Sequence, residues 1–159
     1  MEPTPPGKEF ATRFTNSLTE LQLTVGIYRR IERLMDEWAA DHTVVRASYI
    51  GREVDSVYFQ GGNWPAEALA RPKLQGLAID ESHLYEFIAF AHGFKTGVSD
   101  TKSIVEIEEI WLEPKVDEPF QYRVMLHHEF GVATVLTSAT GEGQDAIRSF
   151  VGRFNYLRG

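Results

Sequence analysis

The sequence predicts a single α+β domain over residues 9–159, in which helices pack on a mostly antiparallel sheet of about five to six strands. Apolar residues recur at helical spacing in several segments, and segments of alternating apolar and polar residues lie between them. Strands and helices do not alternate one by one, which argues against a parallel nucleotide-binding sheet. The expected order is one or two helices, two strands, a helix, three strands and a final helix.

The N-terminal part should be helical after a flexible leader over residues 1–8, which is polar and rich in proline. A helical stripe follows, formed by Phe10, Phe14, Leu18 and Leu21. Residues 21–27 fit two alternatives, a short strand or a helix that continues through Gly26. Over residues 27–41 the helical period is clear, with apolar residues on one face, so this segment should form an amphipathic helix.

Residues 43–60 are expected to form a hairpin, because two β-rich runs flank a turn at Gly51-Arg52. A loop over residues 61–65 should follow, then a short helical turn over residues 66–74 and a short strand over residues 77–79.

A second long helix is expected over residues 80–94. Asp80 is a favourable N-cap residue, and either Gly93 or Gly97 can end the helix. Four apolar residues have the spacing of one buried helical face: Leu84, Phe87, Ile88 and Ala91.

The last third of the chain should contain three strands and a helix. The strand over residues 104–112 changes its alternation at Glu108-Glu109, which predicts a β-bulge there. The strands over residues 121–130 and 132–139 alternate well on either side of a turn at Gly131. The final helix should bury one apolar face: Ala146, Ile147, Phe150, Val151, Phe154 and Leu157.

Composition excludes several functional classes. The 159 residues contain no cysteine, which rules out disulfides, thiolate nucleophiles and cysteine-type zinc sites and favours a cytoplasmic protein. A formal net charge of −7 makes nucleic acid an unlikely partner, because phosphate recognition usually requires a basic surface. No apolar run approaches the length of a membrane span, so no membrane association is expected.

The most enzyme-like residues are His127 and Glu129, which would share one face of a strand and form a histidine with an orienting carboxylate. Structural pairing of both side chains with neighbours is the alternative. The sequence indicates no catalytic residue, no metal site and no cofactor, because no third group is shown to join this pair.

A binding surface is indicated instead by aromatic residues. Asn63 and Trp64 lie in a glycine-containing loop, where an exposed tryptophan can contact a partner or can cover a sheet edge. Tyr85, Phe90 and Phe94 add further aromatic side chains to the expected helix 80–94, and the two phenylalanines fall on a second side of it. A helix with two apolar sides is covered twice, so this segment is a candidate dimer or binding surface.

The expected element order resembles the α-β-β-β-α-β-β-α plan of small acidic bacterial secretion chaperones. This resemblance implies a homodimer that holds unfolded partner proteins, and it assigns no individual residue. The sequence therefore predicts a non-enzymatic protein-binding module of the adaptor, secretion-chaperone or inhibitor and immunity type. The alternative is a small enzyme or small-molecule-binding domain with a pocket between sheet and helices that involves His127, Glu129 and Trp64.

Overall fold

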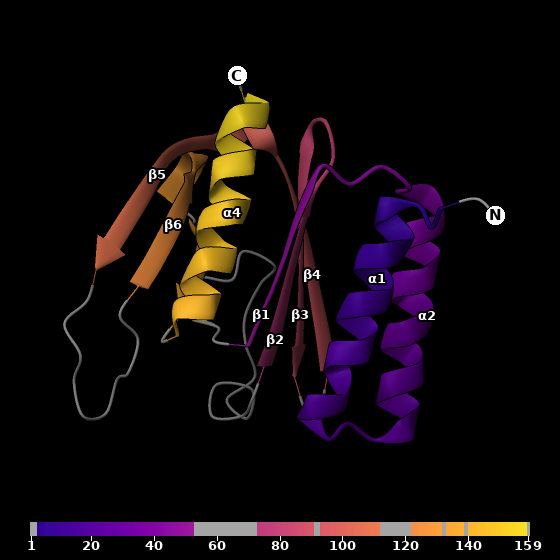
Figure 1. The fold of residues 1–159 in the computed structure, drawn as a ribbon. Helices are drawn as coiled ribbons and strands as arrows, with labels where there is room; N and C mark the ends of the chain where they lie inside the picture. Colours follow the sequence, from indigo (N-terminus) through magenta and orange to yellow (C-terminus); the bar gives the residue numbers. More distant parts are fainter. Residues whose placement is uncertain are drawn as a thin grey trace, which may run out of the picture.

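Two helices open the chain and lie side by side on one face of a sheet (Figure 1). In this computed structural model the described residues are 3–52, 73–90, 93–111, 122–131, 133–138 and 140–158. Helix α1 spans Pro6–Ser17 and helix α2 spans Val25–Asp41. Helix α1 thus begins inside the segment expected to be a leader, and the Gly7 N–H donates to the Thr43 carbonyl at 3.1 Å.

The connection between the two helices corrects both alternatives for residues 21–27. A 3₁₀ helix, η1, spans Leu18–Leu21, and Gln22 then adopts a left-handed conformation with φ of 54°. The Thr24 hydroxyl accepts a hydrogen bond from the Ile27 N–H at 3.4 Å and caps α2. A left-handed residue followed by a cap ends one helix and starts the next, so neither a strand nor a continuous helix forms here.

The described residues that follow form seven antiparallel strands in two sheets, which confirms the α+β class and the antiparallel pairing. Sheet A has the order β1-β2-β3-β4, and sheet B has the order β5-β6-β7. The strands of sheet A are β1 (Ala47–Gly51), β2 (Lys73–Ile79), β3 (His83–Phe90) and β4 (Gly93–Asp100). Those of sheet B are β5 (Ile104–Trp111), β6 (Tyr122–His128) and β7 (Ala133–Ser138). Short 3₁₀ turns η3 (Thr101–Ser103) and η4 (Glu129–Gly131) follow β4 and β6.

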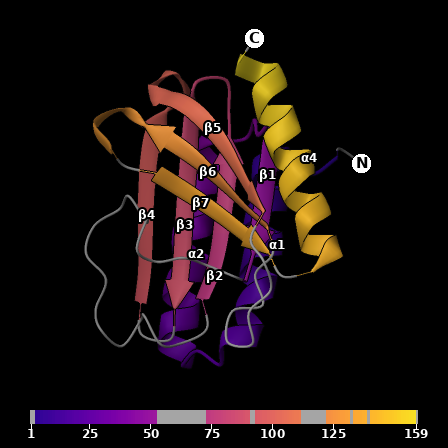
Figure 2. The same cartoon turned by 90° about the vertical axis from the view of Figure 1, so that its left-hand side faces the viewer.

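The expected helix 80–94 is wrong, because β3 and the start of β4 occupy that segment. Sheet A lies between α1 and α2 on one side and sheet B on the other (Figure 2). Five successive residues of β3, Glu86–Phe90, are therefore buried. Burial on both faces removes the alternation that marks a strand, and the remaining apolar run is compatible with either period. Asp80 accepts hydrogen bonds from the Ser82 and His83 N–H groups in a turn and does not cap a helix.

The β-bulge lies nearer the start of β5 than expected. The register shifts between Ile104 and Glu106, whereas Glu108 and Glu109 continue the ladder opposite Met125 and Val124. An extra residue at this position brings Ile104 and Ile107, three residues apart, to the same face of sheet B.

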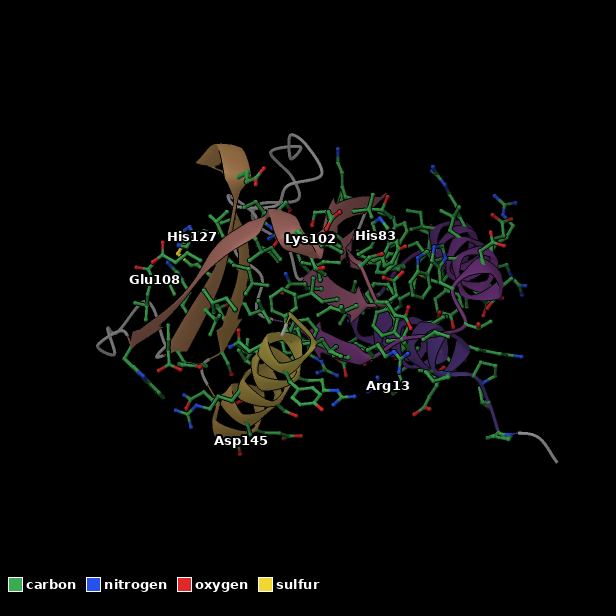
Figure 3. All side chains as sticks on the ribbon, turned by 90° about the horizontal axis from the view of Figure 1, so that it is seen from above. Arg13, His83, Lys102, Glu108, His127 and Asp145 are labelled. Atoms are coloured by element: carbon green, nitrogen blue, oxygen red, sulfur yellow. The ribbon has the colours of Figure 1, made fainter. Side chains whose placement is uncertain are left out.

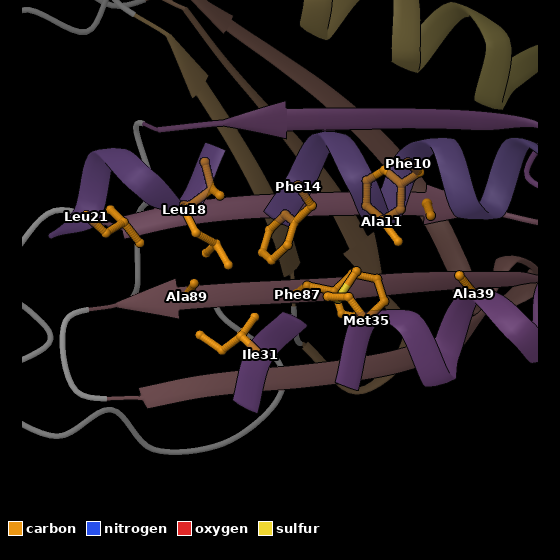
Figure 4. Close-up of a cluster of buried hydrophobic side chains, with 12 residues drawn as sticks. Phe10, Ala11, Phe14, Leu18, Leu21, Ile31, Met35, Ala39, Phe87 and Ala89 are labelled. Carbon is orange, nitrogen blue, oxygen red and sulfur yellow. The ribbon is translucent and has the colours of Figure 1, made fainter. Parts of the chain in front are cut away.

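Two large apolar cores lie within the described part of the chain, beside a small third cluster of Met125, Ala133 and Val135. Figure 4 shows the first, in which Phe10 and Phe14 of α1 and Met35 of α2 meet Phe87 of β3. The second joins sheet A to sheet B and to helix α4, which spans Gly141–Arg158. Ile147, Phe150 and Phe154 of α4 are buried there, as the helical pattern predicts, and Val151 and Leu157 are partly buried, although Ala146 is exposed. Among the described residues no helix is both long enough and apolar enough to cross a bilayer.

The remaining expectations for residues 43–79 are tested only in part. Strand 77–79 is confirmed within the longer β2, whose first two residues replace the end of the helical turn expected over residues 66–74. The second hairpin strand over residues 54–60 and the loop 61–65 lie outside the described residues. The element order also differs from the one that resembled the secretion chaperones, because strands replace the central helix.

Candidate docking groove between α2 and β4

A groove of about 540 Å³ lies between helix α2 and the last strand of sheet A. Helix α2 forms one wall of the groove, and strands β3 and β4 form the floor and the other wall. These two strands lie side by side, with Tyr85 opposite Val98 and Phe87 opposite Thr96. The lining residues are Arg30, Leu34, Met35, Trp38, Tyr85, Phe87, Phe94, Thr96, Gly97 and Val98.

The groove follows from the way α2 meets the sheet. The most buried side of α2 carries Ile31, Met35 and Ala39, which pack into the first core. Leu34 and Trp38, which flank that side, are only partly buried. Strand β4 extends the sheet beyond the strands that the helices cover well, and its Val98 is 60% exposed. An apolar helix flank beside an uncovered strand leaves a hollow with an apolar surface.

Aromatic contacts hold the floor of the groove in place. The Trp38 ring is stacked on His42 with 4.8 Å between ring centroids, and it meets Tyr85 and Phe87 edge to face at 5.4 and 5.2 Å. Phe94 is stacked on Phe87 at 6.2 Å. Such aromatic pairs contribute about 0.5–1.5 kcal/mol each beyond area burial, so the floor is pre-organised.

One polar group of the groove lining, on α2, lacks a hydrogen-bond acceptor. The indole Nε1 of Trp38 is buried and has no hydrogen-bond partner within the described part of the chain. A buried donor without an acceptor costs about 1–3 kcal/mol. By contrast, the Tyr85 hydroxyl donates to Asp80 Oδ2 at 3.2 Å. Burial raises the pKa of Asp80, but the hydrogen bonds from Ser82, His83 and Tyr85 outweigh it and lower the pKa below its usual value.

The structure brings together only some of the residues singled out in the sequence. Tyr85 and Phe94 both line the groove, on neighbouring strands. Phe90 does not, because it is buried opposite Lys73 on the face of sheet A that points toward sheet B. Asn63 and Trp64 lie outside the described residues. The expected helix with two apolar sides is wrong, and Phe90 and Phe94 lie on opposite faces of sheet A. Tyr85 and Phe94, however, share the face toward α2.

His127 pairs with a carboxylate other than the expected one. Its Nε2 lies 2.9 Å from Glu108 Oε1 on the neighbouring strand β5, on the outer side of sheet B (Figure 3). Glu129 is exposed in η4, after the end of β6. Among the described residues, no three histidine or carboxylate side chains gather in an arrangement that could hold a metal ion. The His127 pair is partly exposed and does not line the groove.

A second titratable group lies in the interior. Glu86 of β3 is 1% exposed between the two sheets, and its Oε2 accepts a hydrogen bond from Gln75 Nε2 at 2.9 Å. The same Nε2 donates to the Val135 carbonyl of β7 at 3.2 Å. Burial raises the pKa of Glu86 to about 7, against a smaller opposite effect of the Gln75 hydrogen bond. Glu86 lines neither the groove nor three further surface hollows of the described chain, so we interpret it as a structural feature.

The sequence contains a partial signal for the groove. Leu34 and Trp38 are spaced by four on helix 27–41 and are visible as part of its apolar face, together with Arg30 on the same helix. Val98 and Thr96 carry no such signal, because their exposure depends on β4 being the last strand of sheet A. Comparison with models of known protein families gave no match, and comparison with curated protein sequences gave none either.

Proposed function

We propose that this chain is a non-enzymatic protein-binding module whose docking surface is the groove between α2 and β4. The observation that carries the proposal is the groove itself, which has an aromatic floor at the side of sheet A that the two helices leave uncovered. Docking sites of this kind bind apolar side chains of a partner, and aromatic residues supply much of the binding free energy. The proposal sets this binding in the cytoplasm, because a chain without cysteine needs no oxidising compartment.

The surroundings of the groove favour a protein over a small molecule as its occupant. The groove is open along β4, and its rim carries the side chains of Thr96 and Val98, which are exposed to solvent. Small-molecule sites are usually enclosed and present several convergent polar groups. Here the lining is mainly apolar and the rim has one charged residue, Arg30. A homodimer through Phe90 is not proposed, because that side chain is buried inside the chain.

A display library of random linear peptides tests the proposal and does not require the partner to be identified. Peptides selected on the wild-type protein are labelled, and their affinities are measured by fluorescence anisotropy for wild type, Val98→Asp and Val105→Asp. Val98 in the groove and Val105 on β5 are both strand residues that are 60% exposed, so the two variants are matched. We expect Val98→Asp to weaken binding about tenfold or more, because it sets a charge against the apolar side chains of the partner, and Val105→Asp to leave binding unchanged.

Two results would overturn the proposal. One is that no peptide is enriched, and the other is that the selected peptides bind all three proteins equally. Equal thermal midpoints of the three proteins show that a loss of binding in Val98→Asp does not come from unfolding. This control is expected to succeed, because exposed positions tolerate substitution with changes within about 0.5 kcal/mol.

A further inference from the structure

Strand β4 exposes an edge of sheet A beside the groove. It is the last strand in the order β1-β2-β3-β4, and all eight of its residues, Gly93–Asp100, pair with β3 without a register shift. In an antiparallel ladder, alternate residues direct their N–H and C=O groups away from the partner strand. Within the described part of the chain, the Asp100 carbonyl at the end of β4 accepts a hydrogen bond from the Ser103 hydroxyl at 2.6 Å, and no hydrogen bond reaches the outward groups of the preceding residues of β4. The edge therefore presents a row of main-chain donors and acceptors to another strand.

The devices that usually protect such an edge are mostly missing from β4. Its sequence, GFKTGVSD, contains no proline, and its ladder with β3 contains no bulge. Two of its residues, Gly93 and Gly97, have no side chain that would obstruct an incoming strand. Long, regular edges without proline or bulges readily accept another strand. The edge is thus suited to pairing with an extended segment.

Charge indicates what kind of segment fits. Arg30 lies at the rim of the groove, and Lys95 lies on the opposite face of β4, beside Ile88 of β3. Neither cation forms an ion pair with any described residue, although the chain as a whole has a net charge of −7. Arg46, by contrast, forms an ion pair with Glu81 at 2.7 Å. Two cations without carboxylate partners on either face of one edge favour an acidic partner.

We propose, on the basis of the binding function above, that the partner supplies an extended acidic segment that adds to sheet A as a strand beside β4. Successive side chains of an added strand point to opposite faces of the sheet. On the groove side, apolar side chains would lie beside Thr96 and Val98, and a carboxylate would reach Arg30. On the other side, carboxylates would lie near Lys95. The partner segment therefore carries aspartate or glutamate on the side that faces Lys95, and apolar residues on the groove side with one acidic residue among them at the position nearest Arg30.

The same charges disfavour a second copy of this chain as the occupant. Pairing of two β4 edges around a two-fold axis would bring Arg30 and Lys95 of both copies to one junction. The only carboxylate on β4 is Asp100, and its Oδ1 already accepts a hydrogen bond from the Lys102 N–H at 2.8 Å. An acidic segment of a different protein offers the complementary charge.

Three synthetic peptides test the inference: one with valine and glutamate in alternation and a further glutamate in place of one terminal valine to reach Arg30, one with the same composition in blocks, and one with lysine in place of glutamate. Their affinities are measured for wild type, Arg30→Glu, Lys95→Glu and Arg29→Glu. Arg29 is the neighbouring cation on α2, is exposed, and does not line the groove, so its variant is the matched control. We expect only the alternating acidic peptide to bind wild type, with about tenfold weaker binding to Arg30→Glu and Lys95→Glu and unchanged binding to Arg29→Glu.

Amide hydrogen exchange distinguishes the addition of a strand from a purely electrostatic contact. Addition of a strand slows the exchange of the outward amides of β4, whereas an acidic peptide that only neutralises surface cations leaves them unchanged. The inference is wrong if the alternating peptide does not bind, if it binds all four proteins equally, or if β4 exchange is unaffected. If library peptides still bind in a Val98-dependent way in that case, the groove function stands and only the acidic strand is refuted. A wild-type dimer that Val98→Asp dissociates would assign the edge to a second copy and also refute it.

Discussion

The buried carboxyl group of Glu86 makes the stability of this protein depend on pH in an unusual direction. Glu86 lies between sheet A and sheet B, and Gln75 Nε2 links its carboxyl group to the Val135 carbonyl of β7. Its Oε1 and the Gln75 Oε1 are both buried without a hydrogen-bond partner in the described part of the chain. A charge at this position loses its hydration without gaining a cationic partner among the described residues, and burial therefore raises the pKa to about 7.

The sign and size of the effect follow from proton linkage. The folded protein holds the Glu86 proton more tightly than the unfolded chain, in which the pKa is about 4.5. The contribution of Glu86 is therefore fully present below about pH 4.5 and is lost as the pH rises to about 7. At about 1.4 kcal/mol for each pH unit, the difference between these two pKa values corresponds to about 3 kcal/mol of unfolding free energy. Most carboxyl groups have the opposite effect, because native interactions lower their pKa.

Substitution of Glu86 by glutamine isolates this effect. Glutamine keeps the shape of the protonated side chain and cannot ionise, so Glu86→Gln should behave like wild type at pH 4.5 apart from a constant offset. As the pH rises to 8, the variant should gain about 3 kcal/mol of unfolding free energy relative to wild type. Urea unfolding followed by circular dichroism at a series of pH values measures the difference, and all other titrating groups cancel in it. Glu106→Gln, at an exposed position on β5, is the control and should show no such gain. Parallel stability curves for wild type and Glu86→Gln between these pH values would refute the reasoning.

Further predictions concern the two cores. Phe154→Ala removes a fully buried ring of α4 and should lower the unfolding free energy by about 3–5 kcal/mol. Tyr156→Ala, at a position that is 75% exposed, should change it by less than about 0.5 kcal/mol. Thermal or urea unfolding measures both changes, and equal effects of the two variants would show that α4 is not docked. Gly76→Ala should cost about 1–3 kcal/mol, because a Cβ atom there would lie 2.7 Å from the Phe14 ring. A Cβ atom at Gly152 of helix α4 would meet nothing within 4 Å, so Gly152→Ala should raise the unfolding free energy by up to about 1 kcal/mol. Equal effects of Gly76→Ala and Gly152→Ala would contradict the packing described for Gly76.

The sequence predicts best the elements that have one buried face and one exposed face. Helices α2 and α4 each keep a clear period, because solvent on one side enforces polar residues there. Strand β3 lies in the middle layer and has no solvent side along most of its length. Its apolar residues then occupy consecutive positions, and a helical spacing can be found among them by coincidence. Glu86 is the one charged residue in this run. A charged residue usually indicates an exposed face, but Glu86 is buried and therefore gives no such indication.

The candidate site was predictable in composition but not in position. Tyr85 and Phe94 attract attention as aromatic residues, and the structure places both in the groove. The pairing of β4 with β3, and the lack of a further strand beside β4 in the described chain, depend on contacts between residues that the local pattern does not report. The same holds for His127, whose partner Glu108 is nineteen residues away in the chain and adjacent across the sheet.

The groove is a better candidate binding site than the histidine pair because polar and charged groups without partners in the described chain lie beside it. His127 has a carboxylate partner, and Arg52 and Glu20 likewise form an ion pair with each other, so these groups are satisfied within the chain. Around the groove the opposite holds for groups of two kinds: the outward main chain of β4 and the cations Arg30 and Lys95. Each such group is stabilised little by folding alone and can gain from a partner with matching chemistry. Because β4 and Lys95 form one edge of sheet A and Arg30 lines the groove beside it, a single extended acidic segment can contact these groups at once, which a ligand at His127 cannot do.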